Sequence, residues 1–158
     1  MISISELESR MRPGRFSQGG FLGISEKLEE VLRNDAQLLS QHNLRYADIA
    51  ERLDFLLGYA MRKKNTITYK HYSVIIETFK GFQICPWATD PHHAQCVAGG
   101  GVQYGSISWT IFNQQKQIEI SGPGLMVHLI RDHHFFEGIQ SPYRIDPIKI
   151  SRLLDLLE

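Results

Sequence analysis

Long apolar runs are missing from this sequence. No stretch approaches the roughly 18 consecutive apolar residues that a membrane-spanning helix needs. The first residues, MISISELESRMRPGR, also lack the basic segment followed by an apolar segment that marks a secretory signal. We therefore expect a cytoplasmic protein with no membrane partner.

An excess of either charge is missing as well. The chain has 17 Lys and Arg against 17 Asp and Glu, so its formal net charge is zero. Proteins that bind nucleic acid usually carry a basic excess, because contacts to phosphates supply much of their affinity. Nucleic acid is therefore not the partner that we expect, although a local basic patch is compatible with a balanced total.

Cysteine is scarce, and its placement is the most informative feature of the chain. Cys85 and Cys96 are the only two cysteines, and five of the seven histidines lie in the same stretch, between residues 85 and 134. In the cytoplasm two such thiols are more often reduced or metal-bound than joined in a disulfide. A disulfide between them, or a pair of buried thiols, stays open as an alternative.

The size and composition are those of one globular domain. The chain has 158 residues, of which 42% are hydrophobic and 22% charged. Residues 1–24 show no sustained periodicity, and we predict an N-terminal arm there that Phe16, Phe21 and Leu22 could pin to the body. Residues 25–158 are predicted to form a single domain.

Apolar residues recur at helical spacing in four segments. Ser25 is a predicted N-cap for a helix to about Gln41, and a second helix runs from Tyr46 to Lys64, so the two form a helical hairpin. Two C-terminal helices are predicted at about 125–136 and from Asp146, which caps Pro147.

Strand-forming residues fill the middle of the chain. Residues 66–79 are rich in β-branched and aromatic residues, and Lys80-Gly81 would turn the chain into a short strand that ends at Ile84. Segments 104–112 and 117–120 alternate as a hairpin does. Strands bunched between helices predict an α+β fold with a small antiparallel sheet of about four strands.

The cysteines and two histidines of the 125–136 helix suggest a zinc site. Thiolates and imidazoles are the usual ligands of structural Zn²⁺, which is held in a closed tetrahedral shell. We predict that Cys85, Cys96, His128 and His133 form this shell and clip the loop 85–101 to the helix. His128 and His133 point about 140° apart on an ideal helix, so sharing one ion requires a distorted last turn or an ion near the helix end.

Other ligand sets stay open. His92 and His93 lie in the loop between the cysteines, and either could replace a helical histidine. Asp132, one turn from His128, could be a ligand or could hydrogen-bond one.

A closed shell leaves no position for a reactive water, so we predict a non-catalytic module that binds or regulates a protein partner. A metal-dependent hydrolase, for example a nuclease, is the alternative, with Asp132, His133, His134 and Glu137 from the 128–137 cluster around an open ion. Cys85 paired with a histidine could also be a nucleophile. A homo-oligomer stays open, because the aliphatic helices suit a dimer as well as a core.

A third reading of function is a helix-turn-helix DNA binder through residues 46–64. The opening, YADIAERL, is compatible with the first helix of that motif. However, the same helical period continues without a Gly or Asn at the expected turn, which favours one long helix.

Overall fold

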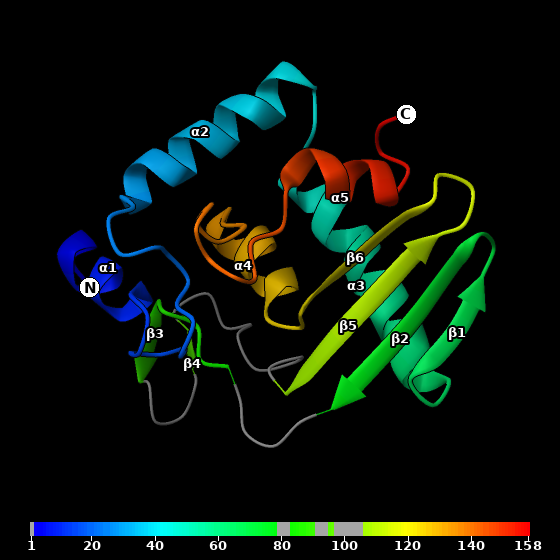
Figure 1. Ribbon diagram of the computed structural model, residues 1–158, viewed down its shortest axis with the longest axis horizontal. Helices are drawn as coiled ribbons and strands as arrows, with labels where there is room; N and C mark the ends of the chain where they lie inside the picture. The colour runs from blue at the N-terminus through cyan, green and yellow to red at the C-terminus, as the bar shows by residue number, and fades with distance from the viewer. Residues whose placement is uncertain (1, 79–82, 91–94, 97–105) are drawn as a thin grey trace.

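The computed structural model describes residues 2–78, 83–90, 95–96 and 106–158, with the backbone alone at residues 89, 90, 95 and 96. Its centre is an antiparallel sheet in the order β1–β2–β5–β6 (Figure 1). These strands are β1 (Thr66–Tyr69), β2 (Tyr72–Thr78), β5 (Ile107–Asn113) and β6 (Ile118–Pro123). With the helices at both ends of the chain, the sheet confirms the predicted α+β class.

The segment predicted as one strand, 66–79, is instead a hairpin of β1 and β2. Tyr69 pairs with Tyr72 across the two-residue turn Lys70-His71. Lys70 has a φ of 54°, a conformation that such turns usually reserve for Gly or Asn. The usual turn signal is therefore absent from the sequence. The short strand predicted to end at Ile84 is wrong at Gln83 and Ile84, which lie in no strand.

The predicted helices are present with shifted ends. They are α2 (Leu28–Gln41), α3 (Tyr46–Arg62), α4 (Met126–His133) and α5 (Pro147–Leu153). Ser25 is not the cap of α2, which starts at Leu28. The carboxylate of Glu26 instead accepts hydrogen bonds from the backbone amides of Gly23, Ile139 and Gln140. Because these bonds hold Glu26 in the loop before α2, the helix starts after this residue.

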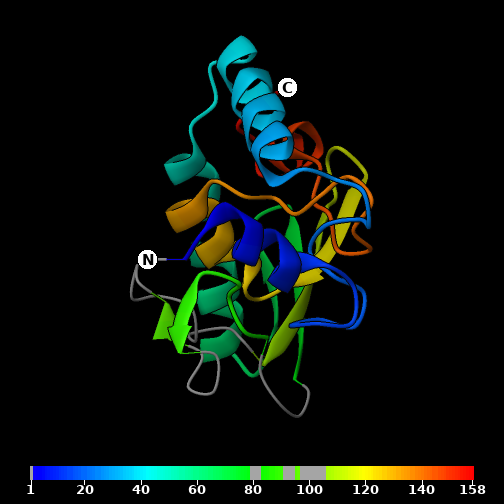
Figure 2. The same cartoon turned by 90° about the vertical axis from the view of Figure 1, so that its left-hand side faces the viewer.

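Residues 1–24 contain a further helix, α1 (Ile4–Met11), capped by the side chain of Ser3. Leu7, Met11, Phe21 and Leu22 are buried, so α1 and the loop after it contribute to the core. A small sheet pairs β3 (Ala88–Asp90) with β4 (Gln95–Cys96). Figures 1 and 2 both place this sheet beside α1.

Helix α4 lies at the junction of two hydrophobic clusters. Val127 and Ile130 belong to a cluster that joins α3, the four-stranded sheet and α5, whereas Leu125 and Leu129 belong to one around α1, Cys85 and Phe135. Helices α3 and α4 pack against each other on one side of the sheet (Figure 2). None of the described helices is both long and apolar enough for a membrane crossing.

Candidate metal centre

Cys85, His128 and His133 converge in the structure. One possible ligand atom from each lies within 4.8 Å of the others. Sγ of Cys85 is 3.5 Å from Nε2 of His133. In a tetrahedral zinc shell, bonds of about 2.3 Å to sulfur and about 2.0 Å to nitrogen place these atoms about 3.5 Å apart. The observed separation therefore fits a shared ion.

The segment that carries Cys85 is fixed from two sides. The amide of Ala88 donates to the carbonyl of Cys85 at 2.9 Å, which closes a turn. From α1, the guanidinium of Arg10 donates to the carbonyls of Pro86 and Ala88, at 3.0 and 2.9 Å. The N-terminal helix thus holds the cysteine segment in place, a role that the sequence did not predict.

His128 is buried and its ring is oriented by an acid. Its side chain is 4% exposed, and Nδ1 lies 2.7 Å from Oδ2 of Asp132, one helical turn away. Nε2 has no hydrogen-bond partner among the described residues. A carboxylate on one ring nitrogen with the other nitrogen open is the usual arrangement of a metal-binding histidine.

His133 reaches the same point because α4 ends there. His134 has a left-handed conformation (φ 54°), and the amide of Phe135 turns back to the carbonyl of Leu129. The His133 ring stacks on Trp87, with centroids 4.1 Å apart, and meets the ring of His128 edge-on at 4.9 Å. His133 is the last residue of α4, so an ion shared with His128 would lie at the end of the helix.

Both imidazoles are held neutral. Burial lowers the pKa of His128 below its ordinary value. Burial, with a smaller contribution from His128, lowers the pKa of His133 to about 4. A metal needs the lone pair of a neutral imidazole, so this environment favours ligation over protonation.

The structure describes only the backbone of Cys96, which pairs with Ala88 across β3 and β4. This register brings Cys96 next to the segment that begins at Cys85. Its side chain lies outside the described residues, as do His92, His93 and the glycines that follow Cys96. The fourth ligand therefore stays a prediction.

The residues of the alternative hydrolase site have separate contacts. Asp132 bonds His128, whereas His134 stacks on Tyr46 with ring centroids 4.1 Å apart. Glu137 is buried, and its Oε1 lies 2.8 Å from the hydroxyl of Ser141. The sequence spacing suggested one cluster, but the turn at His134 directs these side chains apart.

The helix-turn-helix reading fails on helix geometry. Residues 46–62 form one continuous helix, α3, without the turn that a helix-turn-helix requires. No turn divides α3 into a first helix and a recognition helix. Phe55 and Met61 are exposed on this single helix.

Two contributors to the centre were not predicted from the sequence. The ring of Trp87 covers His133. Its position two residues after Cys85 could have predicted this contact, because a large ring so close to one ligand can reach a neighbouring ligand of the same site. Arg10 gave no such signal, since its contacts are made across 76 and 78 positions. No family model, curated protein or solved structure matches this chain. The chemistry of the centre therefore rests on its own geometry.

Proposed function

We propose that the protein binds one Zn²⁺ through Cys85, Cys96, His128 and His133, and that it is a non-catalytic binding or regulatory module. The observation that carries this proposal is the Nε2 atom of His128, which is buried without a hydrogen-bond partner among the described residues and held in place by Asp132. An unmatched buried polar atom costs about 1–3 kcal/mol. A metal bond at Nε2 removes that cost.

The donor set selects the metal. One thiolate and two imidazoles suit zinc, whereas Mg²⁺ and Ca²⁺ take oxygen ligands. Cys96 supplies a second thiolate in this proposal, since β4 brings its backbone beside β3. The resulting shell of two sulfurs and two nitrogens is the usual composition of a structural zinc site.

The surroundings favour a structural ion over a catalytic one. Cys85 is fully buried, and the Trp87 ring covers His133. Asp132, one of the candidate bases of the hydrolase alternative, already bonds His128. The ion would fix the cysteine segment against α4, and a protein partner would bind the surface that this segment shapes.

A second reading is favoured by the same 3.5 Å contact between Cys85 and His133, which also suits a thiolate activated by an imidazole base. The burial of Cys85 argues against it, because a nucleophile has to reach its substrate. The two readings differ in whether the thiol reacts.

The test is metal analysis of the purified full chain together with thiol titration, with and without a chelator. The proposal predicts one zinc per chain and two thiols that react only after chelation. His128→Gln should abolish zinc binding, whereas His134→Gln, which changes the exposed neighbouring histidine on Tyr46, should retain it. Metal-free protein with a rapidly alkylated Cys85 would support the thiolate reading instead.

A further inference from the structure

Three aromatic rings form a cluster that shares no residue with the metal centre. Phe55 and Tyr59 come from α3 and Tyr69 from the end of β1, with ring centroids 5.3–6.0 Å apart. Phe55 is 45% exposed although it is large and apolar. The exposed part of the Phe55 ring is available for contact with a ligand.

Cations surround these rings. The charged groups of Arg62 and Lys63 both lie 6.0 Å from the centre of the Tyr59 ring, and the Lys70 amine lies 5.5 Å from that of Tyr69. All three cationic residues are exposed. We call Phe55, Tyr59, Tyr69 and these three cations the aromatic–basic surface.

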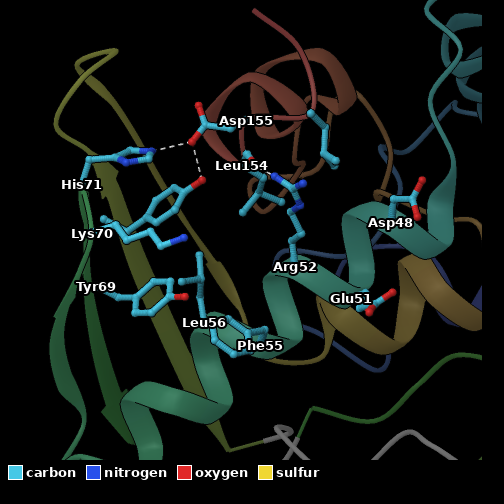
Figure 3. A pocket seen from close by; sticks show the side chains of 12 residues that line it. Asp48, Glu51, Arg52, Phe55, Leu56, Tyr69, Lys70, His71, Leu154 and Asp155 are labelled. Atoms are coloured by element: carbon cyan, nitrogen blue, oxygen red, sulfur yellow. Dashed lines mark hydrogen bonds and ion pairs between the residues drawn. The ribbon is translucent and has the colours of Figure 1, made fainter.

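A hollow of about 760 Å³ adjoins the aromatic–basic surface, between α3, the β1–β2 turn and the segment after α5. Figure 3 shows Lys70 reaching into it from the strand side and Arg52 from the helix side, with Phe55 and Tyr69 below. The volume lies within the range of small-ligand pockets and exceeds what one planar ring needs.

Asp155, the acid inside the hollow, already has hydrogen-bond and ion-pair partners. Asp155 bonds His71 and Tyr72, and its other oxygen is 2.9 Å from Nζ of Lys116. Burial alone would raise the pKa of Asp155, but these bonds outweigh burial and lower the pKa below its ordinary value. The other acids of the hollow, Asp48 and Glu51, lie nearer the start of α3, away from Arg62 and Lys63.

We propose that the aromatic–basic surface binds single-stranded nucleic acid, with a base stacked on Phe55 and backbone phosphates on Lys63 and Lys70. Rings that alternate with cations are how proteins bind unpaired strands, because every base has a face to stack and every nucleotide has a phosphate. A duplex hides its base faces from such rings. The balanced net charge argued against nucleic acid, but the cations here are concentrated on one surface.

An acidic peptide is the competing occupant, since carboxylates also pair with Lys63 and Lys70. It lacks the planar faces that Phe55 would stack. The exposed ring therefore favours nucleic acid, and Phe55 is the residue that separates the two.

The experiment is fluorescence anisotropy of labelled ten-nucleotide oligo-U and oligo-dT with the full chain at low salt. We expect a Kd on the order of 1–100 µM that weakens as salt rises. Phe55→Ala should weaken binding at least about fivefold, whereas Phe55→Trp should retain it. Comparing the two oligonucleotides shows whether RNA or DNA is preferred.

The charge test uses matched pairs. Lys63→Ala with Lys70→Ala should reduce the salt slope by about 1.4, for two phosphate contacts. Arg33→Ala with Lys149→Ala removes two exposed cations from α2 and α5 and should leave binding unchanged. Circular dichroism and thermal unfolding confirm that each variant is folded.

Four results would overturn the proposal: no binding to either oligonucleotide, unchanged binding in Phe55→Ala, equal losses in both charge pairs, or equal affinity for poly-glutamate. The last result would identify an acidic peptide as the occupant. None of these outcomes depends on whether the metal centre is structural.

Discussion

Asp132 fixes His128 through a contact of 2.7 Å between its Oδ2 and the Nδ1 atom of the ring. The contact spans one turn of α4 and determines which nitrogen of His128 remains for a metal. The orientation of the candidate ligand is therefore built into the helix that carries it.

Removing this contact should weaken metal binding without removing a ligand. Asp132→Ala is expected to lower zinc affinity about 10–100-fold, because the His128 ring loses its orientation. Competition with a chromophoric chelator measures the change. Glu30→Ala, which removes an exposed acid from α2, is the control and should have little effect. Equal affinity in Asp132→Ala and the unaltered chain would contradict the assigned role.

Chelation should lower the melting temperature. At a free zinc concentration 100 times Kd, the bound ion stabilises the fold by about 2.7 kcal/mol. For a chain of this size that corresponds to roughly 5–10 °C. Calorimetry with and without chelator measures the shift, and adding zinc back should reverse it. An unchanged melting temperature would show that no metal stabilises the fold.

Arg10 should affect the cysteine segment locally. Arg10→Ala removes two hydrogen bonds to the carbonyls of Pro86 and Ala88, at a cost of about 1–2 kcal/mol. Hydrogen exchange at the Ala88 amide should accelerate, while that in β5 stays unchanged. Arg15→Ala, which loses a bond to the Ser9 hydroxyl, is the matched variant and should not alter Ala88.

Helices and strands were predicted most accurately from the sequence where their apolar residues follow a single regular spacing. The helical spacing through Leu53, Leu56 and Leu57 predicted α3, and the alternation around Trp109 and Ile111 predicted β5. These residues are buried, so pattern and burial coincide. The turn at Lys70 was missed because its residues lack the conformational preference that such turns usually show.

Part of the metal centre was also predictable from the sequence. Clustering of soft ligands suggested Cys85, His128 and His133, which the structure brings together. Arg10 and the hollow beside Tyr69 depend on contacts between distant segments, and no local pattern encodes them. The side chain of Cys96 stays a prediction.

Glu137 should make stability depend on pH. Burial raises its pKa from 4.5 to about 8, and its Oε2 has no hydrogen-bond partner among the described residues. The folded state therefore holds a proton that the unfolded state releases, and stability should fall as pH rises from about 4.5 to about 8. Above that range this contribution is constant.

Glu137→Gln tests the same group. It should flatten this slope and stabilise the fold at pH 8 by on the order of 1–3 kcal/mol, because no charge is then buried. Urea unfolding across the pH range measures both effects. Glu119→Gln, at an exposed position on β6, should leave the slope intact. A steeper slope in Glu137→Gln would be incompatible with a buried, protonated acid.

X-ray absorption at the zinc edge tests the central claim most directly, because it counts the ligands and separates sulfur from nitrogen and oxygen. The account predicts two sulfur and two nitrogen ligands per ion in the unaltered chain, and one sulfur fewer in Cys96→Ser. One sulfur with three nitrogen or oxygen ligands in the unaltered chain would contradict the shell of two thiolates, and protein without zinc would contradict the centre itself.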